Sequence, residues 1–327
     1  MDMRDKRMDN LKGFLIILVV LGHFLELNMQ QPGAKLLYEL IYTFHMPVFV
    51  FVSGYFFQYD LKRIISGLLY PYLVFQTLYL LFVRLFLKIN TPITYKTPYW
   101  LMWYLMAMIA WSLLTRVLEK STGICEGRAE HFKKRVILLT AVFCALIAGY
   151  GNMIERSFSL SRILVFFPFF LAGHFTPKTL RGRYRRLTLI LTGCGICLYT
   201  IFLTSVYEHT KYVWFYEATP YAADGYSICF RGIHMITAVL FCAFLFWIMP
   251  NRELPFLSKA GRKTMQIFLL HGFVVKLCKQ YEVFQKVPYP YLTVLAMTLL
   301  LVWILSSDTL GKIVRPLMRG PGIKRKK

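Results

Sequence analysis

The chain has 327 residues, of which 57% are hydrophobic and only 17% are charged. A soluble domain carries roughly 25% charged residues, so this composition excludes a pair of soluble domains, and it excludes an intrinsically disordered chain as well. The net charge of +23 would suit a nucleic-acid-binding protein, but the basic residues stand in clusters between long apolar runs, which is typical of a polytopic membrane protein.

An all-α fold is predicted, because ten apolar runs approach the roughly 20 residues that a helix needs to cross a bilayer. The runs cover residues 13–29, 37–58, 67–89, 99–118, 136–150, 159–175, 188–206, 229–249, 265–282 and 290–311. No cleavage site follows the first run, so it is predicted to be the first span and not a signal peptide. We expect one transmembrane domain over residues 1–327, with residues 1–12 and the basic tail 312–327 in the cytoplasm.

The distribution of basic residues sets the predicted orientation. The two chain ends and the loops near residues 60, 125, 181 and 257 hold 28 of the 39 Lys and Arg residues. Cytoplasmic loops carry the excess of positive charge in membrane proteins, so both termini are predicted to be cytoplasmic. The even number of predicted spans agrees with this orientation.

Two histidines fall at similar depth in the first two predicted helices. His23 comes eleven residues after Lys12, about 16 Å along the helix, and His45 lies about 13 Å from the outer end of its helix. Contact between the two rings is therefore a hypothesis. An imidazole suits acid–base catalysis because it titrates near neutral pH, and the alternative is a packed, hydrogen-bonded side chain. Glu26, one turn after His23, is a candidate to orient or charge it.

Polar residues also mark the two ends of the predicted bundle. At the cytoplasmic end, three cations suit either a phosphate-bearing ligand or anionic lipid headgroups: Lys12, Lys62 and Arg63. Near the outer helix ends, three further side chains could contact a substrate, although an arginine there can simply reach to the headgroups: Arg162, Arg231 and His234. Cys194 and Cys197 have the spacing of a redox or metal motif, but no acidic or histidine ligand is near, so we expect packing and no metal.

The first two predicted helices carry the most specific motifs. Residues 9–23 read DNLKGFLIILVVLGH, with ten residues between Lys12 and His23, and residues 44–56 read FHMPVFVFVSGYF. Weaker segments follow in order at residues 98–105, 167–173 and 261–271. Together these segments resemble the membrane acyltransferase 3 family over nearly the whole chain, and most closely its fucose 4-O-acetylase-like branch.

The resemblance implies a ten-helix enzyme of the plasma membrane that moves an acyl group, usually acetyl, from cytoplasmic acyl-CoA to a hydroxyl of an envelope or lipid-linked carbohydrate. It matches Lys12 and His23 to the family's signature pair. With the matched depth of His45, we predict that His23 and His45 are catalytic, one of them as general base or as transient acyl carrier. The three cytoplasmic cations would hold the donor phosphates, and the three outer side chains would line the acceptor side. Lys12 stands where many members have Arg, which makes it a point charge in place of a fork, and Asp9 is a candidate orienting residue. Neither a metal nor a nucleic acid is expected.

Two other classes of function stay open. A transporter or flippase for a lipid-linked glycan would also carry polar residues at mid-depth, typically in a fold with internal repeats. No repeat is visible in this sequence. A sensor or a structural membrane partner would need no histidine pair at matched depth.

Overall fold

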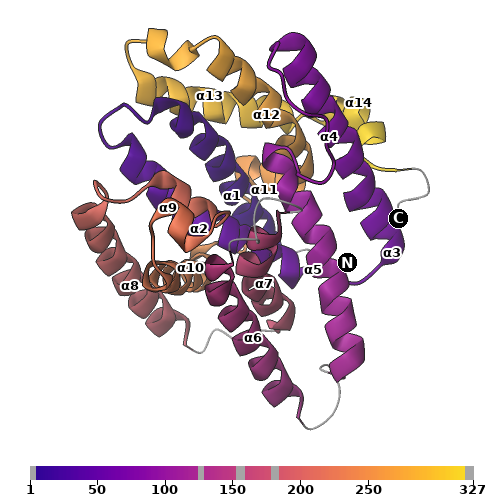
Figure 1. Cartoon of the computed structure of the whole chain (residues 1–327), viewed down its shortest axis with the longest axis vertical. Helices are drawn as coiled ribbons and strands as arrows, with labels where there is room; N and C mark the ends of the chain where they lie inside the picture. Colours follow the sequence, from indigo (N-terminus) through magenta and orange to yellow (C-terminus); the bar gives the residue numbers. More distant parts are fainter. Residues whose placement is uncertain (1–4, 124–128, 152–158, 178–183, 321–327) are drawn as a thin grey trace. The chain divides into compact units, whose positions relative to one another are not determined.

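The structure, a computed structural model, describes residues 5–123, 129–151, 159–177 and 184–320. Within these ranges the chain forms helices and no strand, which confirms the predicted all-α class (Figure 1). Much of the predicted basic loops near residues 125 and 181, and the end of the basic tail, lie outside the described residues. The chain divides into two compact units. The first unit comprises Met1–Phe49, Thr179–Phe215 and Ile233–Val314. The second comprises Val50–Lys178, Tyr216–Gly232 and Arg315–Lys327.

Most helices lie entirely within one or the other of the two units. The first unit holds α1 (Lys6–Leu25), α8 (Arg185–Val206), α11 (Pro255–Arg262), α12 (Thr264–Gln280) and α13 (Pro290–Leu305). The second holds α3 (Leu61–Ile64), α4 (Tyr70–Leu81), α5 (Trp103–Thr122), α6 (Glu130–Ile147), α7 (Leu160–Phe175) and α9 (Tyr221–Asp224). Three helices run from one unit into the other: α2 (Ala34–Tyr55), α10 (Ile228–Ile248) and α14 (Asp308–Met318).

Each of the ten predicted runs contains a helix, but their lengths differ. Six helical segments among the described residues are long and apolar enough to cross a membrane, or seven if the bent pair α13 and α14 is one span. The protein is therefore a helical protein with several membrane-capable segments. The number ten and the orientation of the termini stay predictions.

Two predicted boundaries at the start of the chain and near its end are wrong. Helix α1 begins at Lys6, seven residues before the apolar run, because the Asp5 side chain caps it by accepting a hydrogen bond from the Arg7 amide at 3.0 Å. The predicted span 290–311 is broken, since α13 and α14 meet at an angle of 72°. The Gln266 amide donates to the Leu305 and Ser307 carbonyl oxygens at 2.8 and 3.0 Å, which satisfies carbonyls that the bend releases.

In the first unit, α1 and α11 cross in backbone contact (Figure 1). A β-carbon on Gly13 would lie 2.0 Å from the Leu257 carbonyl oxygen, and one on Gly261 would lie 1.8 Å from the Asp9 carbonyl oxygen. Only glycine allows such an approach. The buried Asn10 amide donates to the Pro250 and Arg252 carbonyl oxygens at 3.0 and 2.8 Å, so this crossing fixes the start of α1.

The second unit uses the same device where the end of α2 crosses α7. A β-carbon on Gly54 would lie 1.9 Å from the Phe170 carbonyl oxygen, and one on Gly173 would lie 1.9 Å from the Phe51 carbonyl oxygen. The buried Trp111 indole on α5 donates to the Ile163 carbonyl oxygen of α7 at 2.8 Å. Helix α7 is thereby held from two sides.

Candidate active site

His23 lies near the end of the segment formed by α1 and the 3-10 turn Glu26–Asn28, five residues before that segment ends. Its side chain keeps 11% of its surface exposed. The Nδ1 atom is 3.3 Å from the Tyr42 hydroxyl and 3.6 Å from a Glu26 carboxylate oxygen. A carboxylate only accepts hydrogen bonds, so this environment favours a proton on Nδ1 and leaves the Nε2 lone pair to act as a base.

His45 reaches the same neighbourhood from α2. Its Nδ1 atom is 2.9 Å from the Ile41 carbonyl oxygen, so Nδ1–H is the donor and Nε2 carries the lone pair. The ring meets Tyr42 edge-on with 4.6 Å between centroids, and Tyr42 in turn meets the His23 ring edge-on at 6.4 Å. The two predicted histidines thus share one neighbour, Tyr42, and their catalytic roles stay predictions.

His271, on α12, is the residue that prediction from the sequence left out of the site. Its ring stacks on the His23 ring with 5.5 Å between centroids and 25° between planes. It is completely buried, and its Nδ1–H donates to the Ile267 carbonyl oxygen at 2.9 Å. A histidine in an apolar run indicates a possible functional residue, but nothing in the sequence places α12 against α1. Tyr42 gave no signal, because a tyrosine in an apolar helix is common.

Lys12 stands eleven residues before His23 on α1, about 16 Å along the helix. Its Nζ is 2.9 Å from a carboxylate oxygen of Asp9, which is buried. The predicted orienting residue Asp9 therefore contacts Lys12, one turn away on the same helix. The carboxylate fixes the ammonium group and offsets part of its charge.

The other two predicted donor-site cations lie in the second unit. Lys62 and Arg63 are on the single turn of α3, and both are exposed. The Arg63 guanidinium pairs with Asp60 at 3.2 Å, and the Asp60 side chain also caps the helix by accepting from the Arg63 amide. Lys12 belongs to the first unit, so the joint phosphate site of the three cations stays a prediction.

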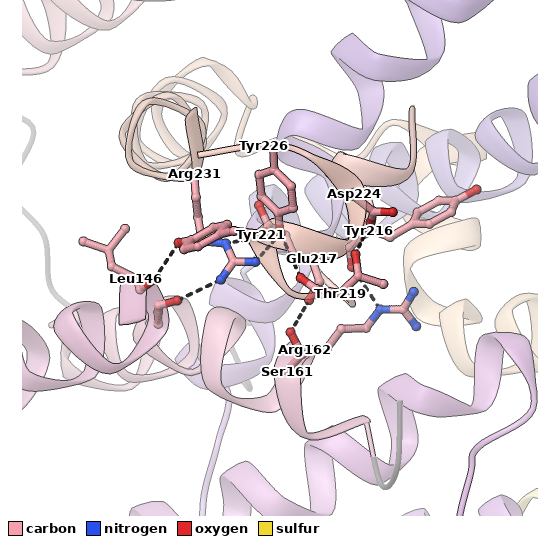
Figure 2. Close-up of polar contacts among 11 residues, drawn as sticks. Leu146, Ser161, Arg162, Tyr216, Glu217, Thr219, Tyr221, Asp224, Tyr226 and Arg231 are labelled. Atoms are coloured by element: carbon pink, nitrogen blue, oxygen red, sulfur yellow. Dashed lines mark hydrogen bonds and ion pairs between the residues drawn. The ribbon is translucent and has the colours of Figure 1, made fainter. Parts of the chain in front are cut away.

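Arg231, at the start of α10, lies in a buried polar cluster of the second unit, which Figure 2 shows. Its Nε is 2.7 Å from a Glu217 carboxylate oxygen, and its two terminal nitrogens donate to the Ala145 carbonyl oxygen and the Tyr226 hydroxyl. The guanidinium also lies over the Tyr221 ring at 4.5 Å. Arg231 and Glu217 are 0% and 2% exposed, so the protein itself already supplies partners for this predicted acceptor-side group.

The segment that carries Glu217 is fastened to α7 as well. Glu217 has a left-handed backbone (φ 53°), which is uncommon for a residue with a side chain. Its carbonyl oxygen accepts from the Ser161 hydroxyl at 2.8 Å, and the preceding Tyr216 carbonyl oxygen accepts from Arg162 Nε at 3.0 Å (Figure 2). A strained residue persists only where its surroundings over-determine it, and these contacts do so.

Two tyrosines complete this cluster as neutral phenols. Burial raises the pKa of Tyr221 to about 12, and burial also raises the pKa of Tyr226. The Tyr221 hydroxyl can therefore donate to the Leu146 carbonyl oxygen, at 2.6 Å, throughout the physiological pH range. The phenols extend the cluster from α9 to the end of α6.

The remaining predicted acceptor-side residues, Arg162 and His234, belong to different units. Arg162 is half-buried, and its guanidinium lies over the Trp103 ring at 4.9 Å and the Tyr216 ring at 6.0 Å, all within the second unit. His234 belongs to the first unit, where its buried ring meets Phe215 edge-on at 5.2 Å. Their contact with an acceptor stays a prediction.

Comparison with known proteins gives two matches. Residues 5–307 match the family described as "Acyltransferase domain". A 56-residue segment is 48% identical to part of the Nodulation protein NolL of Sinorhizobium fredii. That segment covers 16% of this chain and 15% of NolL, so the likeness to this relative is local. No solved structure matches the chain.

Proposed function

The chain belongs to the membrane acyltransferase 3 family and is an acyltransferase, and from this premise we propose that it moves an acetyl group from acetyl-CoA to a carbohydrate hydroxyl. The observation that carries the proposal is the environment of His23. Of the three clustered histidines, His23 keeps part of its side chain exposed, whereas His45 and His271 are buried. A ring that is held at Nδ1 and reachable from outside is suited to take a proton at Nε2.

The chemical step follows from that geometry. His23 Nε2 accepts the proton of the acceptor hydroxyl while the hydroxyl oxygen attacks the thioester carbonyl carbon. The carbon–sulfur bond then breaks, and the leaving CoA thiolate takes the proton back from the imidazolium. Glu26 and the Tyr42 hydroxyl stabilise the ring through Nδ1, and Tyr42 supports it from the side on which His45 lies.

The donor would enter from the cytoplasmic end. Lys12 would hold its phosphates while its pantetheine arm extends along α1. Lys62 and Arg63 belong to the second unit, and their part in donor binding stays a prediction. The rise of about 16 Å from Lys12 to His23 supports this proposal, because a long flexible arm is needed to bridge it. Arg162, Arg231 and His234 are proposed to serve the acceptor side, Arg231 by holding the segment around Tyr216. An envelope or lipid-linked glycan in the plasma membrane is the acceptor proposed.

Transfer of label from [14C]acetyl-CoA to envelope glycan by the purified protein tests the proposal. His23→Gln keeps polarity and approximate size but cannot exchange a proton near neutral pH, so activity should fall roughly 10²–10⁴-fold. His209→Gln, the same change at an exposed loop position, is the matched control and should retain activity. Label that stays on wild-type His23 would indicate an acyl-histidine step, and glycan movement across vesicles without acetylation would favour the transporter.

A further inference from the structure

His271 leaves one polar atom without a partner. Its Nδ1–H is given to the Ile267 carbonyl oxygen, while Nε2 is buried and has no hydrogen-bond partner among the residues that the structure describes. An imidazolium here would leave a buried N–H without an acceptor, so the ring is neutral and Nε2 carries a lone pair. Leaving such an acceptor unsatisfied is unfavourable, and an apolar side chain would fill the same space without that cost.

The ring that carries this lone pair stacks on the His23 ring. The His271 ring lies 5.5 Å from the His23 ring, centroid to centroid, with a Phe268 ring of its own helix at 6.4 Å. A charged group beside His23, the Glu26 carboxylate, lies in the 3-10 turn that follows α1, on the Nδ1 side of the ring. His23 keeps some exposure, whereas His271 behind it has none. A fixed dipole in a water-excluded layer acts strongly on charge that develops next to it.

We propose that His271 is a positioning residue for His23: its stacked neutral ring fixes the plane of the His23 imidazole, and its unpaired Nε2 stabilises the positive charge that develops there during proton transfer. This inference rests on the proposed acetyl transfer through His23. It assigns His271 no contact with donor or acceptor. The hydrogen bond to Ile267 supplies the rigidity, because it ties the ring to its own helix turn.

The matched pair His271→Gln and His271→Met tests the inference. The two side chains have similar length and helix propensity, but glutamine keeps an acceptor oxygen near the position of Nε2 and methionine does not. Because the two rings stack and the lone pair lies in the plane of the His271 ring, the ring acts on His23 through space and not through a hydrogen bond. A fixed dipole of this kind is expected to change the rate about tenfold. We expect this loss in kcat for His271→Met, partial retention for His271→Gln, and an unchanged KM for acetyl-CoA in both.

Kinetics are measured per mole of monodisperse folded protein. If His271→Met fails to fold, His271→Leu takes its place in the comparison with His271→Gln. Wild-type kcat in the methionine or leucine variant would show that His271 only packs. Equal losses in both members of a pair, or a raised KM, would also overturn the inference. Failure of the proposed function is distinct, because wild-type protein would then transfer no acetyl group and His23→Gln would not differ from it.

Discussion

Replacing Glu217 with Gln would remove the charge opposite Arg231 while keeping the shape of the side chain. In the structure, Arg231 is completely buried and its Nε lies 2.7 Å from the Glu217 carboxylate. The substitution leaves the guanidinium with a carbonyl oxygen, a phenol oxygen and aromatic rings as partners. None of these carries the negative charge that compensates a cation without water.

The expected magnitude follows from that burial. Breaking a buried ion pair from one side costs about 3–5 kcal/mol, because the remaining charge is left uncompensated. Removing both charges, with Glu217→Gln and Arg231→Met together, should recover part of that loss, since no uncompensated charge is left in the interior although the introduced amide stays polar. The double-mutant cycle should therefore show strong positive coupling between the two sites.

Thermal unfolding of the purified protein in detergent, followed by helical circular dichroism, measures the effect. At about 2 °C per kcal/mol for a large domain, Glu217→Gln should lower the midpoint by roughly 6–10 °C. A single variant that unfolds within a degree of the wild type would contradict a role for the buried charge pair in stability. That role is also contradicted if the double variant is less stable than either single variant, because the pair would then contribute by packing and not by charge.

Three further outcomes are expected. In steady-state kinetics, Lys12→Ala should raise the KM for acetyl-CoA while Lys12→Arg keeps it near the wild-type value. An unchanged KM in both variants would indicate that Lys12 only contacts lipid headgroups. Gly261→Ala would place a β-carbon 1.8 Å from a backbone oxygen of α1. It should lower the free energy of unfolding by about 1–3 kcal/mol or more in the same assay. Gly232→Ala, which has open space around it, should leave that free energy unchanged. Tyr42→Phe keeps the ring and removes the hydroxyl beside His23, so kcat should fall roughly tenfold with the donor KM unchanged; wild-type kcat would remove Tyr42 from the site.

The fold class, the family and the first part of the candidate site could be predicted from the amino-acid sequence. Apolar runs of near-spanning length require helices, since a backbone in a bilayer must satisfy its hydrogen bonds within each segment. The motif with Lys12 and His23 lies within one helix, where spacing along the chain translates directly into distance. For the same reason the pairing of Glu26 with His23 could be predicted from one helical turn.

The helices that supply the rest of the candidate site are set by tertiary packing and could not be predicted. His271 joins His23 because α12 packs beside α1 in the first unit, a contact between residues almost 250 positions apart that hydropathy does not encode. Apolar helices attract one another with little specificity in hydrocarbon, so their partners are chosen by small residues and polar bonds. In the first unit, the packing of α11 against α1 depends on Gly13 and Gly261 at their crossing and on Asn10 beside them. The partners of Arg231 could not be predicted for the same reason, because Glu217 lies in a left-handed turn and pairs with Arg231 in a cluster built from α6, α7, α9 and α10.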